Sequence, residues 1–473
     1  MKHELYIAIM EHLKRLIRGT GFEGHVLCVG GCCRDELMGD EIKDIDLVVA
    51  LPEGGIRFAE WLEAEGHTAG KVVSYPRYHT AMFRLKDFPD VEIETVQTRK
   101  EKYTERNSRN PETAFGTLEE DILRRDLTIN SLCRNISTGE LVVVTGKGLD
   151  DIRDHIIRTP VDPDITYDDD PLRILRTIRF ASRYGWEVER RTWEGMVHNV
   201  SRLEIITRER VRDELEKMLA SRYPVQAMEM LRRSGAMHYV IPELEDLYDL
   251  TQNKYHSGTA WEHTMQVLDV LAGNSDKPVL RMAALLHDIG KASTRSCTED
   301  GKIHFIGHEK AGADMVESIL ADLRCCSAFI QEVRFLVLHH MDTKRWGVAC
   351  ELMKDKHLRR FQYQCGTEER FMDLMTLINA DNMAHSPEHC MPEHVPHILK
   401  RTEEMKAEGT AMFGYRLPLT GTDVMRIKGL KPGPAVNDCL EYLLKIALVD
   451  PSMDAETMAK HLKGYRIPPG LFS

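Results

Sequence analysis

The first 150 residues alternate between amphipathic segments and short apolar runs. Apolar side chains recur at helical spacing over residues 4–18, and two strand-like runs, HVLCVGG and DIDLVVAL, follow. A second amphipathic segment, IRFAEWLEAEG, precedes the runs TAMFRL and VEIETV. Helices that alternate with short strands predict a small α/β unit built on one short sheet. Residues 99–117 are polar and have no apolar period, which predicts a mobile loop.

From about residue 152 onward, nearly the whole chain has helical periodicity. Apolar positions from Leu172 onward recur at steps of three and four residues, and prolines separate the segments. We therefore expect an α+β protein in which a small mixed head precedes helical domains. The predicted domains are a head over 1–152, a helical neck over 153–225, a helical region over 226–385 with a histidine-rich core at 256–385, and a helical tail over 386–473.

Composition indicates a folded protein without a membrane segment. Of 473 residues, 42% are hydrophobic and 29% are charged, which supplies apolar material for more than one core. No apolar run reaches the ~18 residues of a membrane span. The first residues lack a signal-peptide pattern, so we expect a cytoplasmic protein. The 11 cysteines form no CxxC pair, which favours free thiols and argues against a zinc site made of cysteines.

The first chemical constellation joins a glycine turn to a pair of acids. Asp44 and Asp46 are two residues apart on a predicted strand, so their side chains project from the same face. Two neighbouring carboxylates repel unless a cation neutralises them, and a magnesium-like ion fits. Gly30-Gly31 lets the backbone approach a phosphate, and Arg34 is able to bind one. Each piece alone also suits an ordinary turn or strand end, so the signal lies in the combination.

At their separation of 13 residues, the glycine turn and the aspartate pair resemble the nucleotidyltransferase signature of the DNA polymerase β superfamily. This resemblance implies a third acid on a neighbouring strand. Glu92 and Glu94 share one face of the run VEIETV and are both candidates. By its position after TAMFRL, Glu92 is the better match.

A second group of residues combines arginines with acids. Arg173, Arg176 and Arg179 recur every three residues, so they lie roughly along one face of a helix. Within residues 153–222, 13 of the 14 basic residues are arginine. A solvated face would use lysine freely, whereas the planar guanidinium binds phosphates and base edges. The candidates of this group are Arg125, Asp126, Asn130, Asp169, Asp170, Arg173, Arg176 and Arg179.

Five long motifs, in order along the chain, together resemble those of the class II tRNA nucleotidyltransferases, a family of CCA-adding enzymes and bacterial poly(A) polymerases. These motifs are VGGCCRD, DIDLV, EEDILRRDLTINSL, DDDPLRILRTIRFASRYG and ERVRDELEKML. The resemblance implies that Asp44 and Asp46 bind Mg²⁺, and that Gly31, Arg34 and Arg125 contact the incoming nucleotide. It also implies that Asp170 and Arg173 pair with the edge of C or A, with Arg176 and Arg179 nearby. The chain departs from the family at Asp169, where glutamate is usual.

The third constellation is a set of histidines and aspartates within residues 256–385. Ligands spread over several helices suit a bundle that converges on a divalent metal ion. A lone histidine is usually a core residue, but this segment has several separate histidine clusters. The pattern H…HD…D, with LLHDIGK as its most specific piece, resembles the HD phosphohydrolase superfamily. That resemblance implies His263, His287, Asp288 and Asp381 as metal ligands. His308 and His340 are available for a second metal or for phosphate, and His339 competes with His340 for this role.

The resemblances imply a CCA-adding tRNA nucleotidyltransferase with a fused HD phosphohydrolase. The first activity would use CTP and ATP, need Mg²⁺ and release pyrophosphate; the second would hydrolyse 2′,3′-cyclic phosphates or a 2′-phosphate with a second divalent metal. The protein would bind tRNA, with the tail contributing, as a monomer or homodimer. A poly(A) polymerase or an A-adding enzyme shares the motifs. Rivals of another class are a non-catalytic tRNA-binding protein and an HD hydrolase with a nucleotide-sensing head.

The formal net charge of −12 argues at first against a nucleic-acid partner, because phosphate binding needs a basic surface. A sum over the whole chain, however, does not say where the charges lie. The arginine-dominated stretch 153–222 therefore predicts a concave basic surface for tRNA on an otherwise acidic protein.

Overall fold

The structure, a computed structural model, describes residues 1–102, 112–252, 258–299, 301–347 and 350–468. The chain divides into two compact units. Unit 1 comprises Met1–Glu245 with Asp322–Arg324, and unit 2 comprises Asp246–Ala321 with Cys325–Ser473.

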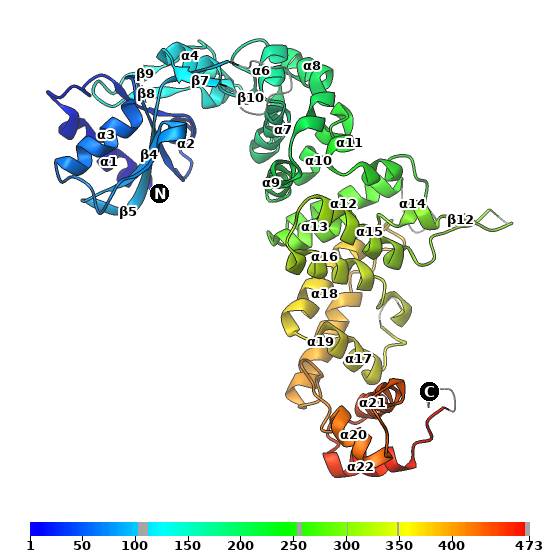
Figure 1. Cartoon of the computed structure of the whole chain (residues 1–473). Coiled ribbons are helices and arrows are strands. Elements are labelled where there is room, and N and C mark those ends of the chain that lie inside the picture. Colours follow the sequence, from blue (N-terminus) through cyan, green and yellow to red (C-terminus); the bar gives the residue numbers. More distant parts are fainter. Residues whose placement is uncertain (103–111, 253–257, 300, 348–349, 469–473) are drawn as a thin grey trace. The chain divides into compact units, whose positions relative to one another are not determined.

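Unit 1 begins with a mixed sheet and the helices that cover it (Figure 1). The sheet strands are β1 (Val26–Val29), β2 (Ile45–Val49), β3 (Val73–Tyr75), β4 (Thr80–Leu85), β5 (Phe88–Gln97), β8 (Cys133–Asn135) and β9 (Leu141–Val142). The helices are α1 (His3–Ile17), α2 (Gly31–Met38), α3 (Gly54–Ala64), α4 (Leu118–Leu123) and α5 (Gly148–Arg153), with single 3₁₀ turns at Pro76–Tyr78 and Thr128–Asn130. These elements include every helix and strand predicted for this region.

The strand order is β3-β4-β5-β2-β1-β8-β9. Strands β2 and β5 run parallel, with Asp46 level with Glu94, and the other neighbours pair antiparallel. The sheet therefore has seven strands, more than the short sheet expected from periodicity. Strands β3, β8 and β9 have only two or three residues, too few to show an alternating pattern.

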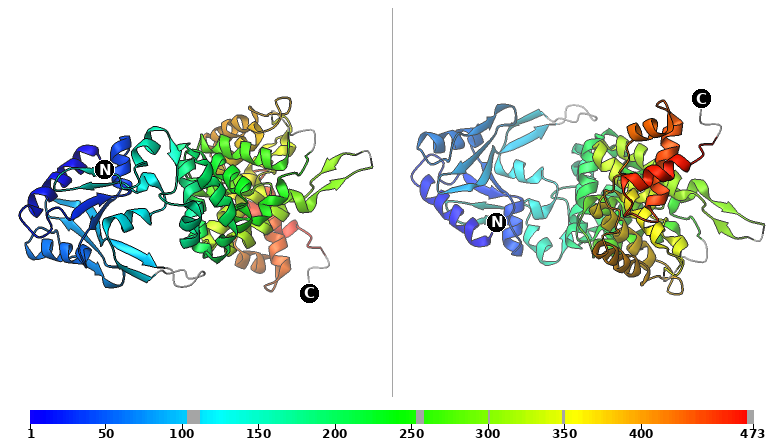
Figure 2. Two further views of the ribbon diagram at one scale, coloured as in Figure 1. Left: turned by 90° about the horizontal axis from the view of Figure 1, so that it is seen from above. Right: turned by 90° about the horizontal axis from the view of Figure 1, so that it is seen from below.

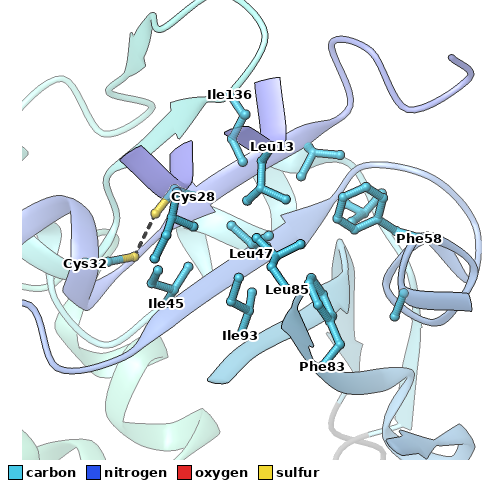
Figure 3. Close-up of a cluster of buried hydrophobic side chains, with 14 of the residues drawn as sticks. Leu13, Cys28, Cys32, Ile45, Leu47, Phe58, Phe83, Leu85, Ile93 and Ile136 are labelled. Carbon is cyan, nitrogen blue, oxygen red and sulfur yellow. Dashed lines mark hydrogen bonds between the residues drawn. The ribbon is translucent and has the colours of Figure 1, made fainter. Parts of the chain in front are cut away.

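The core of this region forms where α1 and α3 bury their apolar faces against the sheet. Leu13, Phe58 and Leu47 are fully buried in one cluster (Figure 3). Burial of such a side chain contributes about 1.5–3 kcal/mol. Gly55 lets α3 lie directly on β5, because a Cβ at this position would stand 2.7 Å from the Val96 Cα.

Three buried thiols lie beside this core. The Cys28 and Cys32 sulfurs are 2.9 Å apart, and the Cys33 thiol donates to the Cys28 carbonyl at 3.2 Å (Figure 3). All 11 cysteines are free, as predicted. Cys28, Cys32 and Cys33 are close enough to hold an ion together, but they supply one ligand fewer than a four-coordinate structural zinc site needs.

The prediction of a mobile loop over 99–117 is wrong at both ends of that stretch. Strands β6 (Arg99–Lys102) and β7 (Glu112–Phe115) pair antiparallel, with Arg99 level with Phe115. Residues 103–111 lie outside the described part of the chain. The two strands are held by backbone hydrogen bonds to each other, which do not require alternating apolar side chains, so the sequence shows no apolar period here.

The rest of unit 1 is helical, as predicted. Its helices are α6 (Pro163–Asp169), α7 (Leu172–Tyr184), α8 (Arg190–Asn199), α9 (Arg208–Leu219), α10 (Pro224–Ser234) and α11 (Met237–Val240), with a 3₁₀ segment at Val200–Ile205 and short strands β10 (Ile156–Ile157) and β11 (Glu187–Val188). Helix α7 packs against α9 and α10 and buries Leu175 and Ile178. It ends at Gly185, whose left-handed φ of 72° terminates the helix.

Unit 2 is almost entirely helical, and both views in Figure 2 show this for the green-to-red part of the chain. Its helices are α12 (Ala260–Ala272), α13 (Pro278–Leu286), α14 (Lys291–Thr294), α15 (His308–Asp322), α16 (Ser327–His339), α17 (Asp355–Cys365), α18 (Glu368–Met383), α19 (His394–Ala407), α20 (Gly421–Lys428), α21 (Pro434–Ala447) and α22 (Ala455–Gly464). It also has a 3₁₀ segment at Lys344–Trp346 and short strands β12 (Ser296–Cys297) and β13 (Ile303–His304), and a further 3₁₀ segment, Pro242–Leu247, begins in unit 1 and ends in unit 2.

Helix α13 is central in unit 2 and packs against α12, α16 and α18. Helices α20 to α22 close a separate small core around Val424, Leu443 and Leu462. Within the described residues, no helix is long and apolar enough to cross a membrane.

Candidate functional sites

Unit 1 contains a cavity of about 750 Å³ between the sheet region and the helices that follow it. Most of the predicted site residues line it: Gly30, Gly31, Arg34, Asp46, Arg125, Asp126, Asn130, Asp169, Asp170, Arg173 and Arg176. In total, eight arginines and four aspartates line the cavity. The cavity wall is therefore basic in a protein of net charge −12, although the 153–222 stretch that predicted a basic surface supplies only Arg173, Arg176 and Arg210.

The turn between β1 and α2 shows why two glycines stand together. Gly30 has a φ of 77°, a left-handed conformation that glycine adopts without strain. A Cβ on Gly30 would also lie 3.1 Å from the Arg125 guanidinium. The turn thus exposes backbone to the cavity at the start of α2, where free amides favour an anion.

The two predicted metal-binding aspartates lie at the start of β2. Asp44 directly precedes the strand and is exposed, whereas Asp46 is its second residue and lines the cavity. Burial, together with Cys32, Glu94 and Asp44, raises the pKa of Asp46 to about 7. Such crowding of negative charge is the situation that a divalent cation relieves, so the donor set fits Mg²⁺.

Both candidates for the third acid lie on the same strand as predicted. Glu94 is level with Asp46 and contributes to its raised pKa. Glu92 lies one step further along the same face and forms an ion pair of 3.1 Å with Arg84. Neither Glu92 nor Glu94 lines the cavity, so the catalytic role of Glu92 remains a prediction and Glu94 remains the alternative.

A buried polar network connects α2 to α7 across the cavity wall. Arg34 donates to the Asn130 Oδ1, and the Asn130 amide donates to Asp126 at 3.0 Å. Arg176 donates to the other Asp126 oxygen, with its Nε at 2.8 Å. Burial alone would raise the pKa of Asp126, but the Arg176 charge and the hydrogen bonds from Asn130 and Arg176 outweigh it and hold the pKa at about 2.

The predicted base-reading pair lies at the junction of α6 and α7. One Asp170 oxygen accepts from the Leu172 amide at 3.1 Å, and the other lies 3.3 Å from the Arg210 guanidinium. Arg173 is 7% exposed and donates to the Thr166 carbonyl at 3.3 Å. These bonds hold an acceptor and a donor side by side on the cavity wall.

Arg179 is the one predicted arginine that the structure does not bring to the cavity. Steps of three residues advance about 300° around a helix, so the direction drifts by about 60° at each step. Arg179 has accordingly turned away from Arg173 and pairs with Glu214 at 2.6 Å, over the Phe180 ring. Sequence reasoning missed Arg77, Tyr78, Arg99, Arg124, Phe180 and Arg210, which also line the cavity. Of these, Arg124, Phe180 and Arg210 stand in quoted motifs, so a signal for them was present.

In unit 2, five of the six predicted metal-site residues form two triads that share Asp288, and the sixth, Asp381, contacts the first triad. The first triad is His263, His287 and Asp288, and the second is Asp288, His308 and His340. His287 lies 3.2 Å from one Asp288 oxygen, and His308 lies 3.3 Å from the other. Asp381 joins through His263 at 3.1 Å. All of these side chains are buried.

The ring orientations of these histidines fit metal ligation. The Nδ1 atoms of His287, His308 and His340 face backbone carbonyls at 2.7–2.8 Å, so each Nδ1 carries the proton and each Nε2 offers a lone pair. The Nε2 atoms of His308 and His340 are 3.3 Å apart, and those of His263 and His287 are 3.4 Å apart. Two nitrogens bound at about 2.0–2.1 Å to one tetrahedral ion would lie at about that separation.

Electrostatics agree with this interpretation at His340; at His287, burial would lower the pKa, but the neighbouring Asp288 outweighs it and raises the pKa. Burial and the neighbouring His308 and His287 lower the pKa of His340 to about 3, which keeps its ring neutral. Burial would raise the pKa of Asp288, but His287 and Lys291 outweigh it and hold the pKa well below its usual range.

Two lysines supply positive charge to the carboxylates. Lys291 lies 2.6 Å from Asp288, and Lys344 lies 3.0 Å from Asp381. Sequence reasoning assigned no role to either lysine or to His385, which all line the adjoining cavity of about 630 Å³. Lys291 stands in the motif LLHDIGK, so a signal for it was present.

The glycine of that motif has a packing role. A Cβ on Gly290 would lie 2.3 Å from the His308 carbonyl oxygen and 2.5 Å from the Gly312 nitrogen. Close contact of these backbones brings His287-Asp288 and His308 into one site.

Three families match consecutive parts of the chain. Residues 26–158 match the poly A polymerase head domain, residues 185–248 the "probable RNA and SrmB- binding site of polymerase A", and residues 255–375 the HD domain. The third match covers the histidine-rich segment that holds both triads.

Similar proteins extend over most of the chain. The CC-adding tRNA nucleotidyltransferase of Thermus thermophilus is 31% identical over 431 residues, which cover 88% of each chain. The multifunctional CCA protein of Nitrosococcus oceani is 33% identical over 69% of this chain and 78% of its own. The crystal structure of the Bacillus stearothermophilus CCA-adding enzyme in complex with CTP has a TM-score of 0.66 at 20% identity, covers 96% of each chain, and shares the fold.

Proposed function

The chain belongs to the family of tRNA nucleotidyltransferases and poly(A) polymerases, and we propose that it adds C and A to the 3′ end of tRNA from CTP and ATP, releasing pyrophosphate. The observation that carries this proposal is the unit 1 cavity. It combines the Asp46 carboxylate, the Gly30-Gly31 turn and eight arginines, a set of side chains that suits phosphoryl transfer between anionic substrates.

In this proposal, the glycine turn and the arginines position the triphosphate and the RNA end. Asp44 and Asp46 would hold Mg²⁺, with Glu92 as the third acid. A divalent ion at this position supplies charge stabilisation for the attacking and departing oxygens. The Asp126–Arg176 pair and Asn130 act as positioning residues, because they fix Arg34 and Arg176 at the cavity wall.

We propose that Asp170 and Arg173 select the base. Cytosine and adenine both present an amino donor next to a ring-nitrogen acceptor, which complements a carboxylate beside a guanidinium. Uracil and guanine present the reverse pattern at this edge and would leave buried polar groups unpaired. Arg210 holds Asp170 in place in this scheme. The side chain of Asp169 lines the same cavity but is given no base contact.

For unit 2 we propose a metal-dependent phosphohydrolase centred on Asp288. His263, His287, Asp288 and Asp381 would hold one divalent ion, and His308 and His340 with Asp288 would hold a second. Such ions supply charge stabilisation for attack on a phosphoester. The chain's own contribution is a buried donor set with fixed ring tautomers, and 2′,3′-cyclic phosphates or a 2′-phosphate are the proposed substrates.

The test separates the two sites by mutation. Asp44→Ala should abolish incorporation of labelled CTP and ATP into tRNA that lacks its 3′ CCA, and should leave metal-dependent hydrolysis of 2′,3′-cyclic AMP unchanged. Asp288→Asn should do the reverse. If either variant lost both activities while remaining folded, the assignment of two separate sites would be wrong.

Other candidates remain within and outside this enzyme class. An A-adding enzyme or a poly(A) polymerase shares the motifs, and the name of the Thermus relative adds a CC-adding enzyme. A non-catalytic tRNA-binding protein would have no use for Asp44 and Asp46. An HD hydrolase with a nucleotide-sensing head is the other rival, and incorporation of CTP or ATP into tRNA would contradict it. The domain limits at 152, 225 and 385, the tRNA contact of the 386–473 tail, the cytoplasmic location and the state as monomer or homodimer stay predictions.

A further inference from the structure

Unit 2 has a second cavity next to the histidine cluster, which we call the cation cleft. Its volume is about 740 Å³, and it lies against the end of α16, the 3₁₀ segment Lys344–Trp346 and α17. The cation cleft is lined by Glu309, Lys310, Leu338, His339, Asp342, Arg345, Trp346, Leu352, His357, Arg360, Phe361 and Gln364.

The cation cleft and the metal-site cavity share their walls. Glu309 lines both cavities. At three points, consecutive residues face one cavity each: His340 and His339, Met341 and Asp342, and Lys344 and Arg345, with the first of each pair on the metal side. The two cavities therefore lie on opposite sides of one wall and meet at Glu309, where a chain-like ligand in the cleft would come next to the metal-site cavity.

The cations of the cleft are not neutralised by the protein. Among the described residues, Lys310, Arg345 and Arg360 form no ion pair and no side-chain hydrogen bond. Neighbouring arginines of unit 2 behave differently: Arg334 pairs with Asp314, and Arg370 pairs with Glu332. All three unpaired cations are exposed.

Two acids, Asp342 and Glu309, also line the cleft, so its lysine and arginine side chains outnumber its carboxylates by one. Asp342 is held by His339 at 2.8 Å, and Glu309 lies 3.6 Å from the Nδ1 of His308. The positive charge of the cleft also affects His357. Burial lowers the pKa of His357, and the neighbouring charges of Lys356, Arg345 and Lys354 lower it further. The wall also offers apolar surface, because Leu352 is 62% exposed there.

We propose that the cation cleft binds the phosphate backbone of an RNA strand whose 3′ end reaches the metal site. It follows that the phosphohydrolase acts on phosphate esters at RNA ends in preference to free nucleotides. The argument rests on unpaired cations for the phosphates, apolar surface for a base and the shared wall with a site built for phosphoester chemistry. The proposal rests on the phosphohydrolase function proposed above.

The experiment compares a polymeric and a small substrate on the metal-loaded full-length protein. The substrates are a short RNA oligonucleotide ending in a 2′,3′-cyclic phosphate and 2′,3′-cyclic AMP. Arg345→Ala and Arg360→Ala should each raise the KM for the RNA about fivefold, the value of one exposed ion pair of about 1 kcal/mol. The slope of log KM against log salt concentration should fall by about 0.7 for each lost phosphate contact. Arg334→Ala, which removes an arginine outside the cleft, is the matched control.

Two results separate failure of this inference from failure of the function on which it rests. If the RNA and the cyclic nucleotide have equal KM values, and neither arginine changes the salt slope, the inference is overturned while the phosphohydrolase stands. If the wild-type protein hydrolyses neither substrate, the proposed function is wrong. In that case, fluorescence anisotropy of the labelled RNA tests whether the cleft binds RNA. Unchanged RNA affinity in Arg345→Ala and Arg360→Ala overturns the inference. Binding of an acidic peptide in place of RNA also overturns it.

Discussion

Replacement of Asp126 by asparagine tests the polar network that joins α2 to α7. The carboxylate is 6% exposed and accepts from Asn130, from Arg176 and from the Leu127 amide. Asparagine keeps the size of the side chain but removes the charge opposite Arg176. The change therefore isolates the charge without creating a cavity.

The size of the effect follows from the shift in pKa. Asp126 has a folded pKa of about 2, against about 3.9 for an unfolded aspartate. A depressed carboxylate pKa adds stability that is complete above the unfolded value and is lost as pH falls through the folded value. The shift corresponds to about 2.5 kcal/mol at pH 7 and to about half of that near pH 3. Asp126→Asn should therefore destabilise unit 1 by about 2.5 kcal/mol at neutral pH, and the difference should shrink in acid.

Urea denaturation of both proteins between about pH 7 and pH 3 measures this difference, and hydrogen exchange in peptides from α4 and α7 assigns it to unit 1. Asp164→Asn is the matched control, because Asp164 bonds to His198 and Asn199 at an exposed position; we expect a loss below about 1 kcal/mol. A loss below about 0.5 kcal/mol for Asp126→Asn, or a difference that stays constant down to pH 3, would refute the reasoning.

Three further predictions concern the acids, the glycine and the histidines of the two sites. Glu92→Gln should lower the kcat of nucleotidyl transfer about 100-fold, whereas Glu94→Gln should lower it less than tenfold. If single-turnover rates fall more in Glu94→Gln than in Glu92→Gln, Glu94 is the third catalytic acid. Gly290→Ala should destabilise unit 2 by about 1–3 kcal/mol in denaturant titration, because its Cβ meets backbone, whereas Gly273→Ala, with no atom closer than 3.6 Å, should change stability by less; equal effects would contradict the packing argument. His340→Gln should remove one bound divalent ion per chain in elemental analysis of reloaded protein, and unchanged metal content would exclude His340 as a ligand.

The sequence predicted the parts of the sites that depend on local geometry. The α+β architecture and the family are confirmed. Alternation predicted Asp44 and Asp46 on one strand face, whereas only Asp46 is on β2 and lines the cavity and Asp44 directly precedes the strand. The metal-site residues were identified by resemblance, and the fold brings all six together. A motif carries such information because it fixes residue types at positions that the fold then joins.

Contacts between distant segments had no such signal. Arg210 pairs with Asp170 across 40 residues, and Lys344 pairs with Asp381 from a different element, so neither pairing appears in any local period. The hairpin of β6 and β7 was read as a loop for the same reason. Arg179 shows that a local pattern also misleads. The three-residue spacing predicts that Arg173, Arg176 and Arg179 lie on one helix face, but each step turns by about 60° and the third arginine pairs with Glu214.

The most direct test of the central claim is the sequence of the 3′ ends that the protein makes. Transfer RNA ending at its discriminator base is incubated with Mg²⁺ and CTP, ATP or both, and the products are sequenced. The account predicts two C residues with CTP alone and CCA with both nucleotides. Long A tails, a single A added without CTP, or an end that stops at CC when ATP is present would contradict CCA addition.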